Sequence, residues 1–255
     1  MAFATIADVG ALMERIAPLE TALAWDNVGL LVGDRRARVN CALLCVDCTM
    51  DVVREAQEVN AQLIIAHHPL LFSPVQKLVL EEPETAIIAQ LLTRGIGLYS
   101  AHSNLDAAKG GVASALAGRL GLTNIKQHGL FCMGECERTL GWKWKQRAQD
   151  LLGADDVRLF GDGMEQVSRI AAIPGAGGDE FFAAKEQGAQ LIITGEAKYH
   201  EILWARAHKI PLIEVGHFYS EAPVLNTLLE GLQNLMNGLE FKLRLCVSAV
   251  NPYKG

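Results

Sequence analysis

The chain lacks any apolar run close to the roughly 20 residues that a membrane-spanning helix needs. Its start, MAFATIADVGALMERIAP, has no basic segment followed by an apolar core and a cleavage site. Blocks of like charge are also missing, and 29 Asp and Glu residues outnumber 23 Lys and Arg residues. We therefore expect a cytoplasmic protein that has no membrane segment and no broad nucleic-acid surface.

Six cysteines do not make a disulfide framework in a chain of 255 residues. Cys45 and Cys48 have the spacing of a zinc or redox pair. However, CALLCVD is typical of a strand, where residues three apart face opposite sides, so two small buried side chains are favoured. The glycine-rich PGAGG (residues 174–178) lacks the dinucleotide-binding and P-loop fingerprints. We interpret it as a tight turn, with an anion-binding loop as the alternative.

A repeat is present in the chain. AQLII occurs at residues 61–65 and 189–193, and each copy follows an apolar strand, a turn and an amphipathic helix that stops at Asn60 or Gly188. Each copy continues through a helix into another short strand. This order predicts an α/β fold of two related lobes, with mainly parallel sheets covered by helices. We place the lobes at residues 1–126 and 127–255, without a flexible linker or an inserted domain.

Histidines and carboxylates follow the ends of four predicted strands. They are His67, His68, His102, Asp106, Glu196, His217 and Glu221. Ligands of parallel α/β sheets gather beyond the carboxyl ends of the strands. Neighbouring strand residues point to opposite faces, but Pro69 keeps His68 extended just past the strand, so that His67 and His68 can diverge around a shared site. Each could hold one of two metal ions roughly 3.5 to 4 Å apart.

Two cations need negative charge, which Asp106 and Glu221 supply. Apolar residues at helical spacing after Pro223 predict that Glu221 begins a helix, with His217 on the approach to it. A single histidine at a strand end is more often a hydrogen-bonding residue than a ligand. The joint occurrence of HH, H-x3-D and H-x3-E at corresponding strand ends favours a metal site.

Three other polar residues have open roles. Asn27, in WDNVGLL, could line a base pocket or cap the following segment. His200 could support Glu196 or act in capping. His208 lies at a predicted helix end, where solvation or capping explains it.

Six ordered motifs, WDNVGLLVGD, IIAHHPLLF, GLYSAHSNLDAAKGG, RLFGD, LIITGEAKYHE and VGHFYSE, cover nearly the whole chain. In these motifs the sequence resembles the Nif-three-like dinuclear metal-centre family, often named GTP cyclohydrolase I type 2 homologues. The resemblance implies five metal ligands: His67, His68, Asp106, His217 and Glu221. It also implies a toroidal homohexamer whose metal sites face an internal cavity. PGAGG departs from the Cys-Gly-Gly-type segment of many relatives.

The family label implies hydrolytic opening of the guanine ring of GTP with loss of formate, by a metal-activated water. Glu196 and His102 are then the candidates for moving protons. The two divalent ions could be Zn, Fe, Mn or Co, which imidazole and carboxylate ligands suit. Two alternatives stay open: a hydrolase of another phosphoester or cyclic amide, and a non-catalytic hexameric metal-binding or regulatory protein.

Overall fold

A computed structural model describes residues 3–254 of the chain. Within them the chain divides into two units: one runs to Ala108 and resumes at Leu225, and the other is Lys109–Val224. This division differs from the predicted boundary at residues 126 and 127. The C-terminal strand β13 (Arg244–Val247) pairs with β4 (Cys41–Cys45) of the first sheet, and α5 (Val112–Arg119) packs on strands of the second. Such long-range pairings leave no local signal in the sequence.

The first unit contains a five-stranded sheet of order β13-β4-β5-β6-β2, in which only the β6–β2 pair is antiparallel. Its further strands are β2 (Gly29–Val32), β5 (Leu63–Ala66) and β6 (Gly97–Ser100), with a small pair of β1 (Ala4–Thr5) and β3 (Arg38–Val39). Its helical segments are α1 (Ile6–Ile16), η1 (Leu19–Thr21), α2 (Met50–Glu58), α3 (Pro83–Arg94) and α4 (Ser103–Ala107). The chain passes between the units at the start of α10 (Pro223–Met236).

The second unit contains a six-stranded sheet of order β7-β8-β10-β11-β12-β9. Its strands are β7 (Thr123–His128), β8 (Phe131–Leu140), β9 (Arg158–Phe160), β10 (Gln166–Ile173), β11 (Leu191–Thr194) and β12 (Leu212–Glu214). Its helical segments are α5, α6 (Lys143–Leu152), η2 (Gly178–Glu180), α7 (Phe181–Glu186), α8 (Tyr199–Ala207) and α9 (His217–Glu221). Strands β10, β11 and β12 are parallel, and the other pairs are antiparallel. This sheet is therefore mixed, whereas the first is mainly parallel as predicted.

The predicted repeat is confirmed in the topology. The order β4-α2-β5-α3-β6 in the first unit corresponds to β10-α7-β11-α8-β12 in the second, and an antiparallel edge strand, β2 or β9, closes each set. The helix stops also correspond, because Asn60 and Gly188 both have left-handed φ angles, 51° and 83°. Since the three strands of each set are parallel, their carboxyl ends lie at one edge of the sheet.

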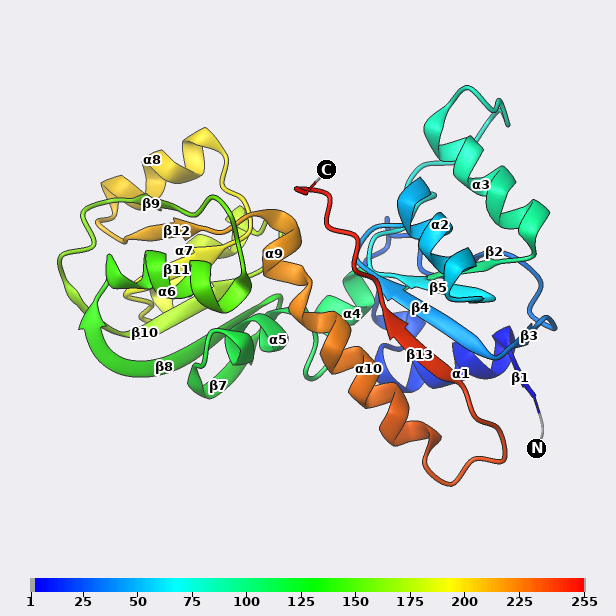
Figure 1. The fold of residues 1–255 in the computed structure, drawn as a ribbon. Coiled ribbons are helices and arrows are strands. Elements are labelled where there is room, and N and C mark those ends of the chain that lie inside the picture. Colours follow the sequence, from blue (N-terminus) through cyan, green and yellow to red (C-terminus); the bar gives the residue numbers. More distant parts are fainter. Residues whose placement is uncertain (1–2, 255) are drawn as a thin grey trace. The chain divides into compact units, whose positions relative to one another are not determined.

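Helices cover both faces of the first sheet (Figure 1). Leu43, Ile64 and Leu98 pack with buried residues of α2 and α3 on one face. On the other face, a Cβ added at Gly97 would lie 2.6 Å from Cδ1 of Ile6, which shows how closely α1 approaches. Alternating strand residues thus fill two apolar layers, as a sheet buried on both faces requires.

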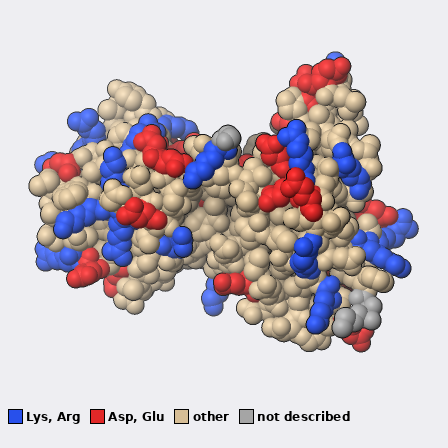
Figure 2. Space-filling view, viewed as in Figure 1, with Lys and Arg blue, Asp and Glu red and all other residues tan. Residues whose placement is uncertain are grey.

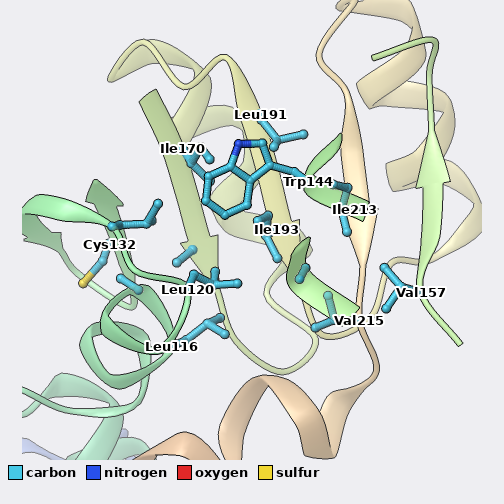
Figure 3. Packing of buried hydrophobic residues seen from close by; sticks show 14 of the residues in the cluster. Leu116, Leu120, Cys132, Trp144, Val157, Ile170, Leu191, Ile193, Ile213 and Val215 are labelled. Carbon is cyan, nitrogen blue, oxygen red and sulfur yellow. The ribbon is translucent and has the colours of Figure 1, made fainter. Parts of the chain in front are cut away.

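The second sheet is also buried on both faces. Trp144 of α6 has no exposed surface and lies over Ile170, Leu191 and Ile193 in one layer (Figure 3). The opposite layer contains Phe181 of α7 with other apolar residues of the parallel strands. Large buried side chains on each face fix the strands that carry the polar residues described below.

Charged residues of both signs are interspersed on each unit in the face that Figure 2 shows. Across residues 3–254, no helix is both long and apolar enough to cross a bilayer. The cysteines are all free thiols. Cys45 and Cys48 are buried in the same apolar layer, and burial raises the pKa of Cys48 to about 12. Cys48 lies beyond the end of β4, which is why the two do not face opposite sides; the interpretation as small buried side chains holds.

Candidate metal site

Three histidines gather at the carboxyl edge of the first sheet. His67 and His68 follow β5, and His102 follows β6. The ring centroids are 4.9 Å apart for His67 and His68, 5.3 Å for His67 and His102, and 5.4 Å for His68 and His102. One ring nitrogen from each lies within 4.8 Å of the others, close enough to share a metal ion. We call these three residues the histidine cluster.

The rings of His67 and His68 are held through Nδ1. Nδ1 of the buried His67 donates to the carbonyl oxygen of Ala101 at 2.9 Å, and Nδ1 of His68 lies 2.8 Å from Oδ1 of Asp47. A proton on Nδ1 leaves the lone pair of a neutral imidazole on Nε2, the nitrogen that can coordinate a metal. Hydrogen bonds of this kind orient histidine ligands in metalloproteins.

His102 is oriented in the same way by Asp26. Nδ1 of His102 lies 3.0 Å from Oδ1 of Asp26, whose side chain is fully buried. Asp26 also accepts hydrogen bonds from the backbone and the hydroxyl of Ser103. Burial raises the pKa of Asp26, but the hydrogen bonds from Ser103 and His102 outweigh it, so that the pKa lies below its usual value. A charged carboxylate therefore holds the third imidazole.

Asp106 adds a carboxylate beside the histidine cluster. It lies in the short helix α4, which starts directly after His102, and its Oδ1 is 3.8 Å from Nε2 of His67. The four-residue spacing in H-x3-D is one helical turn, which brings the carboxylate back over the strand end. The first unit thus brings together four of the seven predicted site residues.

The second unit places His217, Glu221 and Glu196 together. Nε2 of His217 lies 3.1 Å from Oε1 of Glu221, which is buried, and Nδ1 of His217 lies 3.0 Å from Oε1 of Glu196. His217 and Glu221 are the first and last residues of α9, and α10 starts afresh at Pro223. The prediction that Glu221 begins a helix was wrong. The two residues share one helical turn instead, which explains their contact.

The PGAGG loop packs against carboxylates. A Cβ added at Gly175, whose φ is +59°, would lie 2.5 Å from Oε1 of Glu221 and 3.4 Å from Nε2 of His217. A Cβ added at Gly178 would lie 2.0 Å from Cδ of Glu201. Two negative side chains against the loop disfavour phosphate there. A tight turn whose glycines let backbone and ligand residues approach closely fits better than an anion-binding loop.

The other predicted polar residues have structural contacts. Nδ2 of Asn27 donates to the carbonyl oxygen of Leu71 at 2.6 Å, so its amide joins two loops. His208 caps α8, as predicted, with Nδ1 at 2.9 Å from the carbonyl oxygen of Trp204. His200 is highly exposed and lies 3.8 Å from Glu201.

Sequence reasoning missed Asp26 and Asp47. Both lie in segments quoted above, WDNVGLLVGD and CALLCVD, and Asp47 follows the carboxyl end of β4. The rule that polar residues beyond strand ends gather at one edge could have found Asp47. Nothing local marks Asp26, because its partners lie about one third of the chain away.

The donor set suits a transition-metal ion. Imidazole nitrogens with carboxylate oxygens fit Zn, Fe, Mn or Co, and every imidazole here is fixed through Nδ1 by a carbonyl or carboxylate. Each unit therefore carries side chains that could bind metal.

Known proteins resemble this chain over its full length. The family model described as Duf34/NIF3 (NGG1p interacting factor 3) matches residues 4–253. A Clostridium acetobutylicum protein named GTP cyclohydrolase 1 type 2 homolog is 33% identical, with 98% of both chains covered. A protein of the same name from Clostridium perfringens is 35% identical over 92% of this chain and 94% of its own. The crystal structure of a Staphylococcus aureus hypothetical protein matches with a TM-score of 0.94 at 30% identity, covering 100% of this chain and 99% of the other.

Proposed function

Because the chain belongs to the Duf34/NIF3 family, we propose that it is a metal-dependent hydrolase with a dinuclear centre that acts on a nucleotide or a related substrate. The observation that carries this function is the orientation of the histidines. In the four histidines of the candidate site Nδ1 faces a carbonyl or carboxylate oxygen, so that Nε2 is the nitrogen that would coordinate a metal ion.

The proposed ligands are those that the resemblance implies: His67, His68, Asp106, His217 and Glu221. The first three belong to the first unit, and the last two belong to the second. His102 has the same orientation as the ligands of its unit, so it is a further candidate to coordinate metal.

Bound metal would lower the pKa of a coordinated water to about 7 and polarise the bond under attack. The residues of the chain have separate tasks in this function. Asp26 and Asp47 keep the rings of His102 and His68 in one tautomer and orientation. Glu196 does the same for His217 through Oε1 at 3.0 Å, and it stays a candidate for moving protons to or from the substrate.

The substrate and the assembly belong to the same proposal. The curated Clostridium relatives are named GTP cyclohydrolase 1 type 2 homologs, which supports GTP as the first nucleotide to test. A toroidal homohexamer and a cytoplasmic location stay predictions from the sequence.

The test is metal analysis of the purified protein combined with assays of GTP consumption and formate release. Wild type is compared with His68→Ala, Glu221→Ala and the control His208→Ala, which removes a histidine from a helix cap outside the site. We expect about two metal ions per chain in wild type and in the control, and loss of metal and formate release together in the site variants.

Different failures reject different parts of the function. Two metal ions without turnover of GTP would reject this substrate and keep the metal centre. A wild-type protein that binds no metal after reconstitution would reject the whole function, since every step depends on the ions.

A further inference from the structure

Two large aromatic side chains lie exposed beside the histidine cluster. Trp25 and Phe72 are each 57% exposed, and their ring centroids are 5.6 Å apart with an angle of 49° between the planes. The centroid of His102 lies 6.0 Å from that of Trp25 and 6.4 Å from that of Phe72. We call Trp25 and Phe72 the aromatic pair. The aromatic pair therefore lies next to His102, a candidate metal ligand.

Hydrogen bonds fix the two loops that carry Trp25 and Phe72. Asp26, the residue after Trp25, has a fully buried side chain that accepts hydrogen bonds from His102 and Ser103. Asn27 donates from Nδ2 to the carbonyl oxygen of Leu71, the residue before Phe72, at 2.6 Å. The two rings are therefore exposed on an ordered backbone. Asp26 follows Trp25 in the chain and also orients His102, so the same hydrogen bonds fix the backbone beside Trp25 and one ring of the histidine cluster.

The geometry sets the way in which a ligand could use these rings. A planar ring stacked between two aromatic rings needs centroids about 7 Å apart, twice the contact distance of about 3.5 Å. At 5.6 Å and 49° the rings are too close and too tilted for a sandwich. A ligand must instead stack on the exposed side of the pair. Aromatic surface of this kind binds a nucleobase through its face, without a particular hydrogen-bond pattern.

We propose that the aromatic pair, Trp25 with Phe72, is the stacking platform for a planar heterocyclic ring, such as a nucleobase, and holds that ring beside the histidine cluster. This role rests on the proposed function, since it names the part of the substrate that the site recognises. A second copy of the chain is the competing occupant of exposed aromatic surface, and the experiment separates the two.

The experiment measures binding of guanosine and of tripolyphosphate by titration calorimetry. The proteins are wild type, Trp25→Ala, Trp25→Phe, Phe72→Ala and the control Phe3→Ala, which removes a ring of 56% exposure that lies on Arg38. We expect the dissociation constant for guanosine to rise about tenfold in Trp25→Ala, the typical loss when a stacking ring is removed. Phe72→Ala should also weaken guanosine, while Trp25→Phe and the control should stay close to wild type. Binding of tripolyphosphate, which has no ring, should not change.

Two results would overturn the platform. One is guanosine affinity that is absent in wild type or equal in Trp25→Ala, Phe72→Ala and wild type. The other is a fall in oligomeric mass of these variants with guanosine affinity unchanged, which would assign the pair to an interface between copies. Metal content, measured on the same samples, reports separately on the proposed function. A metal-free wild type that binds guanosine through Trp25 would reject the hydrolase and keep the platform.

Discussion

Gly175 should be necessary for the geometry of Glu221 and His217. Its φ of +59° lies in the left-handed region, and an added Cβ would lie 2.5 Å from Oε1 of Glu221. The carboxylate would have to move by about 1 Å to reach an ordinary contact distance. The loop cannot easily yield instead, because the backbone N–H of Gly175 donates to Oγ of Ser220 and its carbonyl oxygen accepts from the backbone of Glu196.

The substitution Gly175→Ala should therefore have two effects. The left-handed backbone should cost about 1 kcal/mol of unfolding free energy. Displacement of Glu221 should lower metal affinity about 10- to 100-fold, as disturbance of groups that orient a ligand typically does. Gly153→Ala is the matched control in the same unit, because Gly153 has a φ of +68° and an added Cβ there meets no atom within 4 Å.

Metal affinity is measured by competition with a chromogenic chelator, and unfolding free energy by urea denaturation. Both variants should lose the stability that a left-handed alanine costs, with any further loss confined to Gly175→Ala, and only Gly175→Ala should bind metal more weakly. If the two variants bind metal equally well, the close approach of Gly175 does not position Glu221, and the reasoning from the added Cβ fails.

Two further predictions concern the first unit. Burial raises the pKa of Tyr99 to about 12, so the folded phenol keeps its proton above pH 10, where the unfolded phenol ionises. The unfolding free energy should then fall as pH rises above 10, and Tyr99→Phe should lose about 1 kcal/mol less than wild type between pH 9 and pH 11. Urea denaturation that shows the same loss in both proteins would contradict this prediction. Asp47→Ala should lower metal affinity about tenfold by releasing Nδ1 of His68, whereas Asp51→Ala, which removes an exposed carboxylate of α2, should not; equal metal titrations would contradict this.

The sequence predicted the parts of the fold that depend on local pattern. The spacing of apolar residues and the helix stops at Asn60 and Gly188 were sufficient to predict the repeated order of strands and helices. These signals are local, because each lies within a few residues of the element that it marks. Parallel strands then had to present His67, His68 and His102 at one sheet edge. Those three residues do lie together, and their role as metal ligands or proton carriers stays a prediction.

By itself, then, the sequence determined the α/β repeat, the candidate ligand residues and the family, because each is present in contiguous motifs. Only the tertiary structure decided which groups orient those candidate ligands. The pairing of Asp26 with His102, the approach of Gly175 to Glu221 and the return of β13 to the first sheet join residues far apart in the chain. Such contacts depend on how whole layers pack, and no local spacing encodes them.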